Sequence, residues 1–297
     1  MIGRFAPSPT GPLHIGSLLA AVASYLQVKS QGGQWLLRIE DIDTPRQMPG
    51  ADQAIIDILE CHGFSWDGEI VYQSQRLDLY REALKRLQDL DLLYGCQCSR
   101  KQIAEHPQAM MGIDGIIYPN ICTRLGLSLD QHAVRIRLSK NNFNKNIMFE
   151  DLVQAKIEQN LALQVGDFVL RRADGIFSYQ LAVVVDDAAQ GVTHILRGCD
   201  LLDSTPRQIF LQKCLGYPSV EYCHIPIIVN AAGEKLSKQT LAPALQAQHA
   251  VANLHQALKL LGQSPPTELM YESLDCLWQW AFQHWNIGKI PARQKIV

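Results

Sequence analysis

Apolar residues follow two alternating spacings along the first sixty positions of the chain. Residues 2–5 can form a short strand, and the run WLLRI at 35–39 has the continuous apolar character of a strand buried on both faces. Between the two, apolar residues recur at helical spacing until Gly32 and Gly33, namely at Ile15, Leu18, Leu19, Val22 and Leu26. A polar turn and a second helix at 51–62 follow. This order predicts a doubly wound, nucleotide-binding parallel sheet.

The later patterns predict further elements of both kinds. A helix is predicted by the spacing of Leu77, Tyr80, Leu84 and Leu87. Residues 96–131 have no clear period and are interpreted as an inserted module, whereas 133–138 alternate like a half-exposed strand. Apolar runs broken by turns return in 167–201 and 222–230, where we expect the sheet to resume. The last 50 or so positions are expected to be helical, with an apolar set at Leu274, Leu277, Trp278, Ala281 and Trp285.

These patterns divide the chain into four parts. Residues 1–73 and 163–240 are expected to form the two halves of the nucleotide-binding fold, and 74–162 the inserted module between them. Residues 241–297 are expected to form a short helical C-terminal region. The predicted fold class is therefore α/β, a Rossmann-like doubly wound parallel sheet with an insertion.

Composition narrows the class of protein. The chain has 297 residues, a net charge of −2, 47% hydrophobic and 19% charged residues, which is typical of a globular protein with a large core. This charge argues against a general nucleic-acid binder, so any such role needs a local basic patch. No signal pattern and no apolar run of membrane-spanning length is present, and we expect a cytoplasmic protein without a membrane partner. Eight cysteines in this setting are expected to be reduced thiols or metal ligands.

The loop PSPTGPLHIGS at 7–17 has the composition of an anion site. It leads from a strand into a helix, whose first N–H groups and dipole favour phosphate. Gly11 and Gly16 remove side chains where a base or phosphate must approach the backbone, and the ring of His14 can donate to a phosphate oxygen. The loop matches neither a P-loop nor a dinucleotide fingerprint. The alternative is a plain helix entry in which His14 only caps or packs.

A second polar segment, EKLSKQT at 234–240, places two lysines around a serine after an apolar run. Lys235 and Lys238 at this spacing can reach a triphosphate. Taken alone, such a pair is more often a solvated face.

Together the two segments resemble the "HIGH" and "KMSKS" motifs of class I aminoacyl-tRNA synthetases, in the right order. RFAPSPTG at 4–11 and RIEDIDTPR at 38–46 narrow the resemblance to the glutamyl/glutaminyl branch. Ser17 replaces the last histidine of the first motif, and the second motif ends in Gln239 and Thr240. The resemblance implies ATP binding, with Mg²⁺, and adenylation of an amino acid. Catalytic roles fall to His14 and Lys238, and ATP-binding roles to Gly11, His14, Gly16, Lys235 and Lys238.

Charge complementarity, within this resemblance, points to glutamate. Its two carboxylates and one ammonium call for two cations and one anion, and arginine suits carboxylates because its fork is bidentate. The residues expected to bind glutamate are Arg4, Ala6, Ser8, Glu40, Tyr179 and Arg197. Which arginine takes the side-chain carboxylate stays open, with Arg4 favoured. The alternative is that Arg4 and Glu40 form an ordinary ion pair between adjacent strands.

The insertion carries a separate signal for a metal. Cys96 and Cys98 lie on one tight turn and Cys122 follows, so a closed tetrahedral Zn²⁺ site needs a fourth donor. From the residues alone, His106 or His132 is the first candidate. Related synthetases with a zinc module have a C-x-C…Y-x₃-C arrangement, and by this resemblance Tyr118 is expected as the fourth ligand of one structural zinc ion. The alternative is ordinary reduced cysteines in a loop.

The distance from the second motif to the end of the sequence completes the resemblance. Only 59 residues follow Lys238, and we expect no anticodon-binding domain among them. The chain is similar in this to the truncated paralogues known as the glutamyl-queuosine tRNA(Asp) synthetase family. That resemblance implies activation of L-glutamate without tRNA and its transfer to the queuosine in the anticodon stem-loop of tRNA(Asp). The alternatives are a short glutamyl-tRNA synthetase acting on tRNA(Glu) and a non-catalytic tRNA-binding paralogue.

Overall fold

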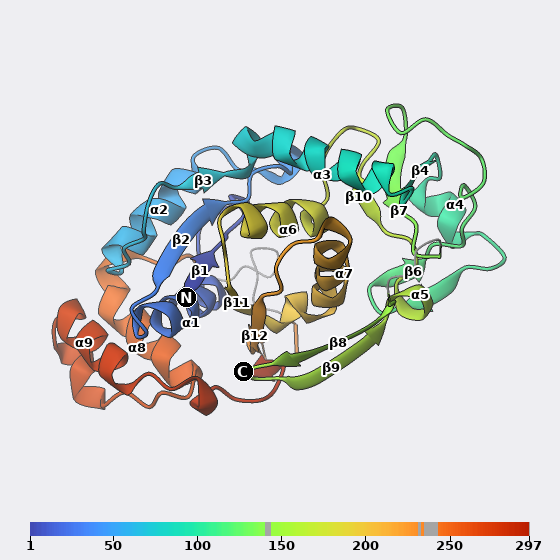
Figure 1. Ribbon diagram of the computed structural model, residues 1–297. Coiled ribbons are helices and arrows are strands. Elements are labelled where there is room, and N and C mark those ends of the chain that lie inside the picture. The colour runs from blue at the N-terminus through green and yellow to red at the C-terminus, as the bar shows by residue number, and fades with distance from the viewer. Residues whose placement is uncertain (140–143, 231–232, 235–242, 297) are drawn as a thin grey trace.

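A large, twisted sheet forms the centre of the molecule (Figure 1). The computed structural model describes residues 1–139, 144–230, 233–234 and 243–296. Within these residues the sheet has seven strands, in the order β3 (Val71–Tyr72), β2 (Gln34–Ile39), β1 (Ile2–Phe5), β11 (His194–Gly198), β12 (Glu221–Ile225), β8 (Asn146–Asp151) and β9 (Ala155–Asn160). All neighbouring pairs from β3 to β8 are parallel, and only β9 runs antiparallel to its neighbour. The predicted α/β fold with a mostly parallel sheet is confirmed.

Helices cover both faces of this sheet (Figure 1). One hydrophobic core includes side chains of α1 (Ile15–Lys29), α2 (Ala51–Cys61), α8 (Ala250–Leu260) and α9 (Leu274–His284). A second core includes side chains of α3 (Leu77–Asp89), α6 (Tyr179–Ala189) and α7 (Thr205–Leu215). Because the chain leaves β1 into α1 and reaches α7 after β11, the winding changes direction between these two adjacent strands. Ligands bind at such a switch point in doubly wound sheets.

The strand β2 shows how the sequence sorts its side chains. Trp35, Leu37 and Ile39 belong to the core beneath α1, as the apolar run predicts. Successive side chains of a strand point to opposite faces, so Arg38 and the following Glu40 face α6 instead. Both are buried, and Arg38 is 0% exposed. The α6 side of the sheet is therefore held here by charge as well as by apolar contact.

The inserted part has its own small sheet, β10 (Val169–Arg171), β7 (Ala133–Ile136) and β4 (Leu93–Cys96). The stretch interpreted as irregular also contains α4 (Arg100–Ala104) and a hairpin of β5 (Met110–Gly112) and β6 (Gly115–Ile117). These elements are too short for a sequence period to show. A further helix, α5 (Leu161–Gln164), lies after β9.

Three sequence expectations differ from the structure. The apolar run over 179–189 was expected among resumed strands, but it forms the helix α6, begun by the Ser178 side chain that accepts from the Leu181 N–H. An apolar run buried on several sides has the same composition in a helix and in a strand. The strand β10 joins the small sheet instead of the large one. The hairpin of β8 and β9 was not expected, and it extends the edge of the large sheet.

The C-terminal region is helical, as predicted, with α8 and α9 packed against α1. It ends in β14 (Lys295–Ile296), which pairs with β13 (Ile227–Ile228). Within the described part of the chain, no helix combines the length and the apolar character that crossing a membrane requires.

Candidate active site and metal centre

A cavity of about 280 Å³ opens at the carboxyl ends of β1 and β11. It is lined by eight of the residues predicted to form the site: Arg4, Ala6, Ser8, His14, Gly16, Glu40, Tyr179 and Arg197. Gly11 belongs to the same loop but does not line the cavity; its φ of +139° is a conformation that glycine adopts far more easily than other residues. Lys235 and Lys238 lie outside the described residues.

His14 caps the helix that follows the opening loop. Its Nδ1 accepts the N–H of Gly16 at 3.1 Å, so the ring proton of the neutral imidazole is on Nε2. Nε2 is 3.4 Å from Oγ of Ser17, the residue that replaces a histidine of the motif. The capping role weighed as an alternative is therefore present. It does not compete with the cavity, because the same ring lines it and is oriented by the cap.

The described residues on both sides of the lysine segment lie near this loop. Ile228 lines the cavity before the segment. After it, the N–H of Leu245 donates to the carbonyl of Leu13 at 2.9 Å. Described residues on both sides of the segment thus either line the cavity or bond to a residue that lines it.

Arg4 pairs with Asp187 of α6 and Glu40 pairs with Arg38 of β2, so the two side chains do not pair with each other. Nε of Arg4 donates to Oδ1 of Asp187 at 3.1 Å. Arg38 donates to the same oxygen at 2.8 Å and lies 3.5 Å from Oε1 of Glu40. Among the described residues these are the ion pairs of the two side chains, so the alternative of an ion pair between Arg4 and Glu40 is wrong.

The two buried carboxyls of this group differ in their ionisation. Burial raises the pKa of Glu40 to about 7, and the guanidiniums of Arg38 and Arg4 offset only part of that rise. Burial also acts to raise the pKa of Asp187, but direct bonds from Arg4 and Arg38 outweigh it and the pKa is lowered. Asp187 is therefore a fixed anion that orients the arginines. Glu40 keeps a raised pKa although Arg38 lies 3.5 Å away, so a further positive group in the cavity would stabilise its carboxylate form.

Arg197, on β11, is held at almost every donor. Its Nε donates to Nε2 of His224 at 3.1 Å and one Nη1 hydrogen to the hydroxyl of Tyr179 at 3.1 Å. Both Nη2 hydrogens are used, by Thr205 at 2.7 Å and Gln208 at 2.8 Å. A guanidinium has five N–H donors, so among the described residues one donor, on Nη1, remains for a ligand.

Several residues of this site escaped the sequence reasoning: Arg38, Asp151, Asp187, Thr205, Gln208 and His224. Two of them carried a usable signal. An arginine within a buried strand and a pair of aspartates within an apolar helix both need buried partners, because isolated charges are not tolerated there. The others are ordinary polar residues whose importance depends on tertiary contact alone.

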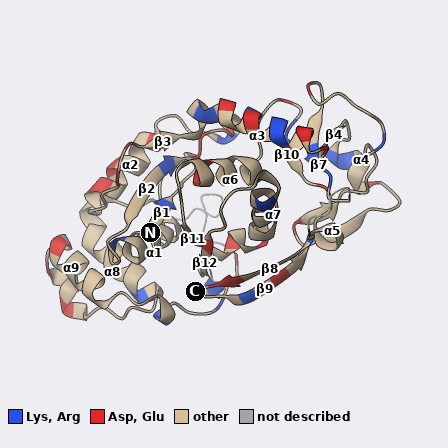
Figure 2. Cartoon of the chain, viewed as in Figure 1, with Lys and Arg blue, Asp and Glu red and all other residues tan. Residues whose placement is uncertain are grey.

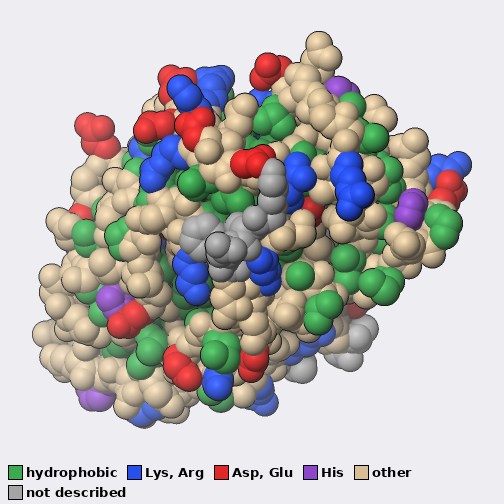
Figure 3. Space-filling model, turned by 45° about the vertical axis from the view of Figure 1, so that its right-hand side comes forward, with side chains coloured by type: hydrophobic (Ala, Val, Ile, Leu, Met, Phe, Trp, Pro, Cys, Tyr) green, Lys and Arg blue, Asp and Glu red, His purple; other side chains and the backbone are tan. Residues whose placement is uncertain are grey.

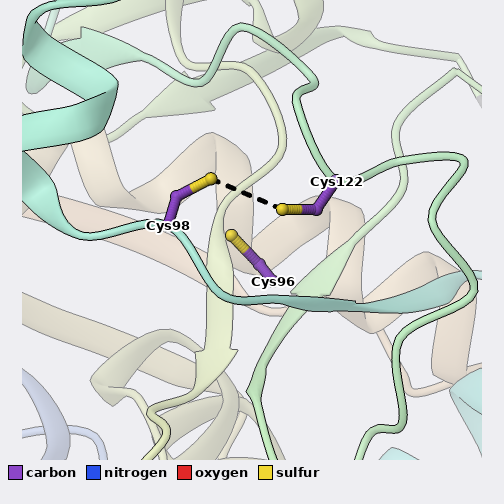
Figure 4. Close-up of side chains that lie close together, drawn as sticks. All are labelled: Cys96, Cys98 and Cys122. Carbon is purple, nitrogen blue, oxygen red and sulfur yellow. Dashed lines mark hydrogen bonds between the residues drawn. The ribbon is translucent and has the colours of Figure 1, made fainter.

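The metal site brings together the three cysteines that the spacing predicted (Figure 4). Their sulfur atoms lie within 4.8 Å of one another, and those of Cys98 and Cys122 are 3.4 Å apart. The hydroxyl of Tyr118 is 3.4 Å from Sγ of Cys96 and 3.5 Å from Sγ of Cys98. The cysteines thus form a group that can hold a metal ion.

Neither histidine candidate belongs to this group. Nδ1 of His106 accepts from the Gln108 N–H at 3.2 Å, and Nδ1 of His132 lies 3.0 Å from the carbonyl of Ser128. Within the part of the chain that the structure describes, only these three cysteines form a group of His, Cys, Asp or Glu side chains close enough to hold one metal ion. The Tyr118 hydroxyl lies beside the sulfur atoms of Cys96 and Cys98.

A basic side chain supports the cluster from outside. The guanidinium of Arg135 lies 3.9 Å from the centre of the Tyr118 ring. Burial acts to raise the pKa of the Cys96 thiol, but hydrogen bonds from Tyr118 and Arg135 outweigh it, and the pKa is lowered. Thiolates are the form that binds metal, so these contacts suit Cys96 as a ligand, whereas burial raises the pKa of Cys98 to about 11.

Comparison with known proteins decides the family. Residues 1–262 match the family described as tRNA synthetases class I (E and Q), catalytic domain. The chain belongs to this family. One relative is the glutamyl-Q tRNA(Asp) synthetase of Dechloromonas aromatica, which is 52% identical over 295 residues. The match covers 99% of this chain and 97% of that protein. The protein of the same name from Chromobacterium violaceum is 52% identical over 292 residues, 98% and 95% of the two chains.

Solved structures agree on the fold. Glutamate-tRNA synthetase from Elizabethkingia anophelis matches with a TM-score of 0.79 at 23% identity, covering 100% of this chain and 68% of that one. This class I synthetase fold is the Rossmann-like architecture that the first sixty residues predicted.

Proposed function

We propose that the protein is a glutamyl-Q tRNA(Asp) synthetase. It activates L-glutamate with ATP, without needing tRNA, and transfers the glutamyl group to the queuosine in the anticodon stem-loop of tRNA(Asp). The observation that carries the proposal is a cavity at the switch point with two arginines and one carboxyl of raised pKa, on a chain that matches proteins of that name along nearly its whole length.

The charges of the cavity suit one glutamate in one orientation. Glu40 takes the ammonium, which adds a second positive group beside Arg38 and stabilises the buried carboxylate. Among the described residues, Arg4 donates a hydrogen bond only from Nε, to Asp187. Its two Nη groups can therefore donate together to both oxygens of the side-chain carboxylate. Arg197, with one donor left, takes the α-carboxylate beside the hydroxyl of Tyr179. Ser8 and Ala6 form the wall of the cavity next to the amino acid.

ATP enters as its Mg²⁺ complex over the opening loop. Nε2–H of His14 and the first turn of α1, behind Gly11 and Gly16, hold the phosphates. An oxygen of the α-carboxylate attacks the α-phosphorus, the bond to pyrophosphate breaks, and Lys235 and Lys238 balance the charge that builds on the leaving group. A hydroxyl of queuosine then attacks the carboxyl carbon to form an ester, the bond from that carbon to the AMP phosphate oxygen breaks, and the hydroxyl proton leaves with AMP.

The inserted module is proposed to bind a structural Zn²⁺ and to contact RNA. Cys96, Cys98, Cys122 and Tyr118 supply three sulfurs and one oxygen, a set that suits tetrahedral zinc, which would fix the turns of the module. Residues 96–138 contain five Lys or Arg and three Asp or Glu, against a net charge of −2 for the chain. Figure 2 shows basic residues on and around α4. Figure 3 shows Lys and Arg side chains spread across the middle of the face of the molecule that it draws. We also propose the division of the chain into four parts, 1–73, 74–162, 163–240 and 241–297.

One assay separates the candidate functions. Purified protein is incubated with ATP, radiolabelled glutamate and total tRNA from cells with or without queuosine. The proposal expects label on tRNA(Asp) only in the queuosine-containing preparation, released by mild base as expected for an ester. Label on tRNA(Glu) in both preparations identifies a short glutamyl-tRNA synthetase, and no label identifies a non-catalytic paralogue.

A further inference from the structure

Behind the cavity, a buried carboxylate and a histidine form a chain of hydrogen bonds that ends on Arg197. Oδ2 of Asp151 lies 2.6 Å from Nδ1 of His224, and both side chains are 0% exposed. Nε2 of the same ring accepts from Nε of Arg197 at 3.1 Å and lies 3.0 Å from the hydroxyl of Thr205. Asp151 and His224 do not line the cavity themselves. Their influence on a ligand must pass through Arg197.

We propose that Asp151 and His224 are positioning residues that set the orientation of the Arg197 guanidinium, and with it the affinity for the amino acid. The inference rests on the proposed function, because it assumes that Arg197 binds a carboxylate of glutamate. Its physical basis is the tautomer of His224. A neutral imidazole has one N–H and one acceptor, and only the tautomer protonated on Nδ1 offers Nε2 as an acceptor to Arg197.

The hydrogen bonds of Asp151 fix which tautomer His224 adopts. Oδ1 already accepts three backbone N–H groups, from Val153 at 3.0 Å, Gln154 at 2.8 Å and His224 at 3.2 Å. Oδ2 is therefore the atom that faces the ring, and as a carboxylate oxygen it can only accept. The proton is thus held on Nδ1. In agreement, burial lowers the pKa of His224 to about 4, and the pKa of Asp151 is lowered because its hydrogen bonds outweigh its burial.

An isosteric substitution tests this argument. In Asp151→Asn, the three backbone donors keep the amide oxygen in the place of Oδ1, so the NH₂ group faces the ring. Nδ1 of His224 must then accept, and its proton moves to Nε2, where it opposes the N–H of Arg197. Two donors now face each other. The loss of a hydrogen bond to a charged group predicts a rise of about ten- to hundredfold in the KM for glutamate.

The measurement is glutamate-dependent ATP–pyrophosphate exchange, with KM determined separately for glutamate and ATP. We expect the KM for ATP to stay within about twofold of wild type. Asp167→Asn is the matched control: this aspartate is also buried and accepts from a backbone N–H and from Tyr94, but its contacts lie in the small sheet. A rise in both KM values together, or a glutamate KM unchanged in Asp151→Asn, overturns the inference.

Three further variants test whether a loss of folding is the explanation. A glutamine at 224 offers a carbonyl oxygen to Arg197 without any tautomer, so Asp151→Asn with His224→Gln should recover most of the glutamate affinity; no recovery overturns the inference. If Asp151→Asn has no cooperative thermal transition, His224→Gln and His224→Phe are compared instead. Only the phenylalanine variant should lose glutamate affinity, and equal KM values overturn the inference. Absence of glutamate-dependent exchange in wild type instead refutes the proposed function.

Discussion

The ionisation of Glu40 should control how strongly the free enzyme captures glutamate. The pKa of Glu40 is about 7 because burial is only partly offset by Arg38 and Arg4. The ammonium of glutamate requires the carboxylate form. At about pH 8 roughly nine-tenths of this group is ionised, and at about pH 6 roughly one-tenth, so kcat/KM for glutamate should fall about tenfold as the pH is lowered across this range. The direction follows from the raised pKa, since the competent form is lost as pH falls through it.

The assay is ATP–pyrophosphate exchange at subsaturating glutamate and saturating ATP, followed across this pH range. Glu40→Gln is the matched control, because the amide has the same shape and does not titrate. Its kcat/KM for glutamate should be lower than that of wild type at about pH 8 by tenfold or more, and should not follow the wild-type pH slope. A flat wild-type profile, or an equal slope in both proteins, would refute the assignment of Glu40 to the ammonium.

The remaining predictions concern the other parts of the site. Arg4→Ala should raise the KM for glutamate by about tenfold or more and the KM for ATP far less, because the bidentate edge faces the amino acid; equal changes in both KM values would remove this assignment. Lys238→Ala should abolish ATP–pyrophosphate exchange while the melting temperature stays near that of wild type, and near-normal exchange would exclude its role. Purified protein should contain about one zinc per chain by metal analysis and Cys98→Ser much less, since a tetrahedral site loses a thiolate; equal zinc contents would contradict the cluster.

Much of the site could be predicted because its residues belong to contiguous motifs. His14 and Gly16 belong to one short motif, at the cap and in the first turn of α1, and the helix is visible from its apolar spacing. The order of strands and helices then places Arg4, Glu40 and Arg197 at the same edge, because parallel strands end together. The cysteine spacing predicted the three-cysteine group for the same reason, since Cys96 and Cys98 share a turn.

The rest could not be read in this way because its partners are far apart along the chain. Asp187 bonds Arg4 across 183 positions, and Asp151 bonds His224 across 73. The hairpin that supplies Asp151 lacks a clear apolar period, and α6, which supplies Asp187, has the composition of a strand.

The sequence by itself determined which chemical groups are present and at which strand ends they lie. Local spacing and short motifs depend on neighbouring residues only. The tertiary structure alone decided what each group can do. It tied Nε of Arg4 to Asp187, engaged four of the five Arg197 donors with described residues, and buried Glu40 until its pKa rose to about 7. These properties depend on desolvation and on contacts between distant segments, and both exist only once the chain has folded.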